Sequence, residues 1–85
     1  MKFSHRNRGT CSTMTYLDLN EDHTIQEIEI VGGCNGNLKG IASLLRGMKA
    51  EDAIEKMKGI HCGPRPTSCP DQIALALEEA LAELG

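Results

Sequence analysis

The sequence is poor in aromatic residues, since its 85 residues include one Phe, one Tyr and no Trp. The core must therefore come from Ile, Leu, Met, Val and Ala. A chain of this length forms one domain, over residues 1–85, and buries only about 60–65% of the surface that its unfolded form exposes. Such a thin core often needs a metal, disulfides or a partner subunit, so we also consider a homo-oligomer.

Long apolar runs are absent too. No stretch approaches the length of a membrane span, and residues 1–10 lack the apolar segment of a signal peptide. We therefore expect a cytoplasmic protein that does not bind a membrane. The net charge of −3 argues against nucleic acid as a partner. In the cytosol, the four cysteines are expected to be thiols or metal ligands rather than disulfides.

Familiar catalytic motifs are missing as well. No Ser/His/Asp pattern indicates a hydrolase, and the glycine-rich residues 32–37 lack the Lys-Ser/Thr ending of a P-loop. No CxxC pair gives the spacing of a zinc ribbon. We therefore expect no catalytic activity from the chain by itself.

The N-terminal half has the alternation of β-strands. Residues 12–19 are rich in Thr, Tyr and Leu, and after a polar turn residues 24–31 alternate isoleucines with glutamates. Residues 1–10 alternate more weakly and are expected to supply an edge strand. This pattern predicts a small antiparallel sheet of three strands that is covered on one face.

The C-terminal half has helical periodicity instead. The expected helices cover residues 38–45, residues 50–57 and residues 70 onward, and glycines follow the first two where a helix would end. Asn35 or Asn37 is the expected N-cap of the first helix. Strands followed by helices predict an α+β domain, with three helices covering the sheet.

The four cysteines carry the main chemical signal; they are Cys11, Cys34, Cys62 and Cys69. Each lies at a turn or close to a predicted helix start rather than at a core-facing position. Soft thiolates at loop ends suit zinc or an iron–sulfur cluster. Three hypotheses stay open: a metal site built from all four, a redox dithiol of Cys62 and Cys69, and inert thiols in an interaction module.

The helix that follows Cys69 favours its thiolate form. Pro70 suits the first helical position, so Cys69 is the expected N-cap, facing unpaired backbone N–H groups. Three residues are candidates for supporting the metal ligands from a second shell: His61, Asp71 and Asn35. The simpler interpretation makes His61 a surface residue and Asp71 a helix cap. His5 and His23 are expected to be exposed.

Two motifs in order resemble the TSCPD domain. Residues 67–71 spell TSCPD, and residues 33–40 read Gly-Cys-Asn-Gly-Asn-Leu-Lys-Gly. The resemblance covers essentially the whole chain. It implies a metal-binding module that occurs alone in small bacterial proteins and at the C-terminus of cobalamin-dependent ribonucleotide reductases. It implies a link to deoxyribonucleotide synthesis, with a ribonucleotide reductase or another redox protein as partner. The chain is too short to hold the reductase barrel itself.

A looser resemblance is to iron–sulfur scaffolds of the NifU/IscU type. That family also runs from a cysteine through two strands to Gly-Cys before a helix and His-Cys before a last helix. Cys11, Cys34 and Cys62 match this order, whereas Cys69 is extra and the scaffold's Asp after the first cysteine is absent. This resemblance implies a shared fold and a thiolate pocket.

Overall fold

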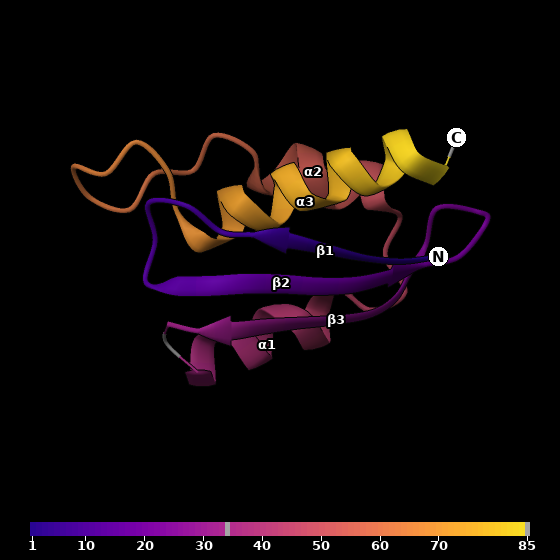
Figure 1. Ribbon diagram of the computed structural model, residues 1–85, viewed down its shortest axis with the longest axis horizontal. Coiled ribbons are helices and arrows are strands. Elements are labelled where there is room, and N and C mark those ends of the chain that lie inside the picture. The colour runs from indigo at the N-terminus through magenta and orange to yellow at the C-terminus, as the bar shows by residue number, and fades with distance from the viewer. Residues whose placement is uncertain (34, 85) are drawn as a thin grey trace.

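Three strands precede three helices in the computed structural model, which describes residues 1–33 and 35–84 (Figure 1). In chain order the elements are β1 (Lys2–Arg6), β2 (Ser12–Leu19), β3 (Ile25–Gly32), α1 (Asn35–Leu45), α2 (Ala50–Met57) and α3 (Cys69–Leu84). The predicted α+β architecture is confirmed, and β2 and α2 have their predicted bounds. Helix α1 begins earlier than expected, so Asn37 lies inside it rather than at its N-cap.

The sheet has the order β1-β2-β3, with both neighbouring pairs antiparallel. Phe3 lies opposite Leu17, and Leu17 lies opposite Ile28, so one row of apolar side chains crosses all three strands. Leu17 and Ile28 are buried, whereas the next residues along their strands, Tyr16 and Glu29, are exposed. This alternation confirms the sheet with one covered face.

The helices form the layer that covers this face. Helix α1 packs against β3, α3 packs against β1 and β2, and α2 packs on α3. In Figure 1, α1 lies beside β3 and the pair α2 and α3 lies beside β1, at the two edges of the sheet. One apolar core joins all the layers, and its largest fully buried apolar side chains are Leu19, Ile25, Ile28, Ile73 and Leu77. The core therefore contains no aromatic residue that is fully buried, as the composition predicts.

The turn between α1 and α2 is joined to the start of β3. Gly47 ends α1 with a φ of 87°, a conformation that costs glycine little, and its N–H donates to the Ile25 carbonyl at 2.9 Å. The Ile25 N–H in turn donates to the Met48 carbonyl at 2.9 Å. Lys49 adds a bridge to Thr24. The turn thus occupies the first part of the outer edge of β3.

Helix length and composition also bear on membranes. Within residues 1–33 and 35–84, no helix is both long enough and apolar enough to cross a bilayer.

Candidate functional site

Three of the four cysteines fall within the described residues, and each is a free thiol. Cys11 is exposed directly before β2, Cys62 is exposed in the loop between α2 and α3, and Cys69 is half-buried in the first turn of α3. Cys34 lies outside the described residues, so its predicted role stays untested.

Two contacts bring parts of this cysteine set to the same end of the sheet. The Ser12 hydroxyl lies 3.0 Å from the Cys69 Sγ, which places the start of β2 on the start of α3. Gly33, with a φ of 70°, packs so tightly on Cys11 that an added Cβ would lie 3.2 Å from the Cys11 Sγ. The backbone just before Cys34 is therefore in contact with Cys11.

The described cysteines do not complete a metal site by themselves. In the part of the chain outside position 34 and the C-terminal residue, no three His, Cys, Asp or Glu side chains are grouped so that they could hold a metal ion. Cys11, Cys62 and Cys69 therefore do not form a three-ligand group in this structure. The four-cysteine site, which includes Cys34, stays a prediction.

The N-cap of α3 is Ser68, and the expectation that Cys69 caps this helix is wrong. The Ser68 carbonyl accepts from the Gln72 N–H at 2.9 Å, and its hydroxyl accepts from the Asp71 N–H at 3.1 Å. These two bonds define an N-cap residue. Pro70 is consequently the second helical residue, where its missing N–H still has no intrahelical partner. Cys69 remains in the first turn.

Asp71 holds the two ends of the loop that carries Cys62 by hydrogen bonds. Its buried carboxylate accepts hydrogen bonds from the Thr67 hydroxyl and, at 2.7 Å, from the Gly59 N–H. The Thr67 bond, followed by the Gly59 bond, lowers the pKa of the Asp71 carboxyl; burial opposes this, and the charges of His61 and Lys58 add to it. The loop between Lys58 and Thr67 is thus closed at its base by one carboxylate.

The other two residues that were expected to support a metal ligand, His61 and Asn35, have different surroundings. His61 is exposed, as the simpler interpretation expects, and its charge contributes to the lowered pKa of the Asp71 carboxyl. Asn35 starts α1, and its side chain lies outside what the structure describes. Neither position tests the predicted support of a metal ligand.

His5 is more enclosed than the sequence suggests, whereas His23 is exposed at 41% of its side chain. The His5 side chain is 11% exposed, with Nδ1 2.8 Å from the Glu79 carboxylate and Nε2 3.0 Å from the Gln72 amide oxygen. The expectation of an exposed His5 is wrong because the C-terminal helix covers β1. His5 instead links β1 to α3.

A buried polar network beneath the cysteines is absent from the sequence predictions. Asn7 donates to the Ser12 hydroxyl at 2.9 Å and accepts from Thr15 at 2.9 Å, and Ser12 then contacts Cys69. Ser12 and Thr15 are 2% and 0% exposed, so their hydroxyls need these partners. Thr15 shares the inward side of its strand with leucines, which was the available signal. No sequence signal marks Asn7 as buried.

A small α+β domain with thiols at one end of its sheet is the class that this fold and site define. A family model, the TSCPD domain, matches residues 2–81, which is nearly the whole chain. The chain therefore belongs to the TSCPD domain family. No curated protein and no solved structure matches it significantly, so the NifU/IscU likeness stays a prediction.

Proposed function

We propose that the chain is a cysteine-ligated metal-binding module that serves ribonucleotide reduction in the cytoplasm and is not catalytic by itself. Zinc or an iron–sulfur cluster would be held by Cys11, Cys34, Cys62 and Cys69. The observation that carries the proposal is the 3.0 Å contact between the Ser12 hydroxyl and the Cys69 Sγ, because it joins the turn that holds Cys11 to α3.

Gly33 packs closely on the Cys11 Sγ. This contact supports a site at the end of the sheet where β2 begins and β3 ends. Thiolate donors fit both candidate metals, and Cys69 lies in the first turn of α3, where its Sγ contacts the start of β2. Cys62 lies in a loop whose residues 58–66 are all exposed. A bound metal would cross-link this loop to the sheet and stabilise a thin core.

The link to ribonucleotide reduction rests on the TSCPD family. TSCPD domains form the C-terminus of cobalamin-dependent ribonucleotide reductases, so a ribonucleotide reductase or another redox protein is the proposed partner of this chain. The module would act on that partner rather than carry the reaction itself.

The first test is metal analysis of the chain purified without oxygen. We expect close to one equivalent of zinc, or iron with the visible absorption of a cluster, because four thiolates bind zinc tightly. Changing any one of the four cysteines to Ser should remove most of the metal. His23→Gln, in the turn at the other end of β2 from Ser12, is the control and should retain it. Less than roughly 0.2 equivalents of zinc plus iron in the unchanged chain would contradict the proposal.

A redox thiol carrier is the second candidate, favoured by one contact. The Cys62 N–H donates to the Thr67 carbonyl at 3.1 Å, which ties the loop of Cys62 back toward Cys69. The two thiols would lose two electrons and two protons to a partner disulfide and form a disulfide of their own. Thiol titration before and after mild oxidation decides: two thiols lost, without bound metal, would favour the carrier. Full folding and reductase binding by a chain with all four cysteines changed to Ser would instead indicate an interaction module.

A further inference from the structure

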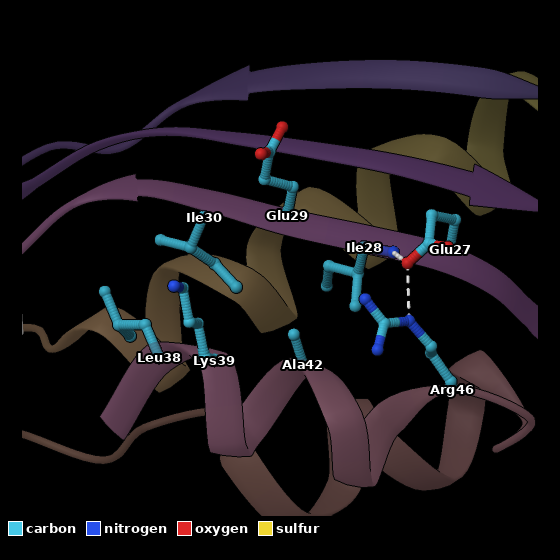
Figure 2. A pocket seen from close by; sticks show the side chains of 8 residues that line it. All are labelled: Glu27, Ile28, Glu29, Ile30, Leu38, Lys39, Ala42 and Arg46. Carbon is cyan, nitrogen blue, oxygen red and sulfur yellow. Dashed lines mark hydrogen bonds and ion pairs between the residues drawn. The ribbon is translucent and has the colours of Figure 1, made fainter. Parts of the chain in front are cut away.

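Among residues 1–33 and 35–84, no strand pairs with the outer edge of β3 beyond its first residue. β2 occupies one side of β3, and the turn at residues 47–48 occupies the other side only at Ile25. Farther along, the outer side of β3 faces α1 across a groove with a volume of about 570 Å³ (Figure 2). The chain therefore begins to add a fourth strand at Ile25 and then leaves the rest of the edge open.

The backbone along this open edge points its hydrogen-bonding groups outward. The Ile28 N–H donates to the Glu27 carboxylate at 3.2 Å, and the same oxygen accepts from the Arg46 Nε at 2.5 Å (Figure 2). This carboxylate oxygen takes the place of the carbonyl that a neighbouring strand would offer. Because backbone direction repeats every second residue, the Ile30 N–H faces the same way.

The groove has an apolar floor suited to the side chains of an added strand. Ile28 and Ile30 point from β3 toward α1, and Leu38 and Ala42 line the groove from α1 (Figure 2). Lys39 and Arg46 of the same region also line it, so the basic side chains of an added strand must lie on the other side, beside Glu29. Helix α1 packs against β3 and lies beside it on the side away from β2 (Figure 1). This position of α1 is what gives the edge a floor.

The opposite side of the same edge is acidic. Glu27 and Glu29 lie on the open face of the sheet, and Glu29 points away from α1 (Figure 2). Among the described residues no ion pair involves Glu29. The residue opposite Glu29 on β2 is the uncharged Tyr16. A basic side chain on an added strand would lie beside Glu29, where opposite charges on adjacent strands attract.

We propose that the β3–α1 groove binds an extended segment of a partner protein as a fourth strand. Its backbone would pair with Ile28 and Ile30, its apolar side chains would face Leu38 and Ala42, and alternate Lys or Arg side chains would face Glu29. Hydrogen bonds to the strand edge would supply affinity, and the alternation of apolar and basic residues would supply specificity. The proposal stands independently of any metal.

A second copy of the chain fits this edge poorly. Its strand β1 has the right alternation, with Lys2 and Arg6 on one face and Phe3 and His5 on the other. In the folded chain, however, the face with Phe3 and His5 is covered by α3. That face cannot contact Leu38 and Ala42 of another copy. Strand β3 of another copy would bring Glu27 and Glu29 toward the same acidic edge, where like charges repel, so a basic extended segment of another protein is the proposed occupant.

The experiment uses a labelled peptide of alternating Lys and Val residues, with fluorescence anisotropy as the measure of binding. We expect a Kd below about 1 mM and slower hydrogen exchange at the Ile28 and Ile30 amides. A peptide of alternating Glu and Val should bind more weakly. Glu29→Gln should weaken the Lys-Val peptide roughly two- to fivefold, the range of one cross-strand charge pair. Glu55→Gln, which removes the same charge from exposed α2, is the control and should leave binding unchanged.

Four results would overturn the proposal. They are no binding of the Lys-Val peptide, equal binding of the two peptides, equal weakening by Glu29→Gln and Glu55→Gln, and binding without protection of Ile28 and Ile30. Each measurement applies to the unchanged fold, because Glu29 and Glu55 are exposed and lie outside the apolar core.

Discussion

Asp71 makes the loop before α3 sensitive to acid. The hydrogen bonds from Thr67 and Gly59 lower the pKa of its carboxyl below its usual range in the folded chain. A lowered folded pKa means that the stabilisation is present above the unfolded pKa and is lost as pH falls through the folded pKa. We therefore predict full stability near neutral pH and a steep loss below about pH 4.

The variant Asp71→Asn should be less stable at pH 7 by about 1–3 kcal/mol, because one amide cannot accept both bonds and leaves a buried donor unpaired. It should also show a smaller loss between about pH 4 and pH 2. Urea unfolding at several pH values measures both effects. Asp52→Asn, on the exposed surface of α2, is the control. Equal acid sensitivity in Asp71→Asn and the unchanged chain would contradict this account.

Ser68 has a separate role at the same helix end. Its hydroxyl accepts from the Asp71 N–H and donates to the Ile60 carbonyl at 2.6 Å, so it joins the cap of α3 to the loop. We predict that Ser68→Ala lowers the free energy of unfolding by about 1 kcal/mol, the typical value of an N-cap. Thermal unfolding is the measurement, and the exposed Ser4→Ala should change stability far less.

At the scale of single elements, α1 is intrinsically weak. It contains Gly36 and Gly40, has no acidic residue in its first turn and no basic residue in its last, and so depends on packing against β3. Nothing lies within 4 Å of the position where Gly40 would carry a Cβ. We predict that Gly40→Ala stabilises the chain by about 0.5–1 kcal/mol because alanine loses less entropy in a helix.

The control for this prediction is Gly47→Ala. Gly47 also has free space around it, but its φ of 87° is unfavourable for alanine, so that variant should be destabilised. Both variants add the same methyl group. A difference between their denaturant midpoints therefore reports the backbone conformation at each position. Destabilisation by Gly40→Ala would contradict the prediction that glycine lowers the stability of α1.

At the scale of the whole molecule, metal and stability should be coupled if the proposed site exists. The core lacks large aromatic side chains, so a cross-link between the Cys62 loop and the sheet would add substantially to a small domain. We predict that a strong chelator lowers the melting temperature, and that added zinc restores it in proportion to its concentration. The chain with all four cysteines changed to Ser should melt at one temperature with or without chelator.

The elements of this fold follow closely from local sequence. Isoleucines alternating with glutamates predicted the face of β3, because backbone periodicity decides which side chains share a face. In the same way the spacing of Ala53, Ile54 and Met57 predicted α2, and the spacing of leucines and alanines predicted most of α3. The end of α3 was less predictable. Ser68 and Cys69 are adjacent candidates for its cap, and only the hydrogen bonds of the folded loop distinguish them.

The sequence by itself determined the α+β order, the one-sided sheet and the family, since these depend on periodicity and on motifs within short stretches. Tertiary structure alone decided which distant polar groups meet. It buried His5 under α3, joined Ser12 to Cys69, and left the edge of β3 open beside α1. The physical reason is that a strand pattern fixes which way a side chain points, whereas the packing of helices of about 10 Å width on a narrow sheet fixes what it touches.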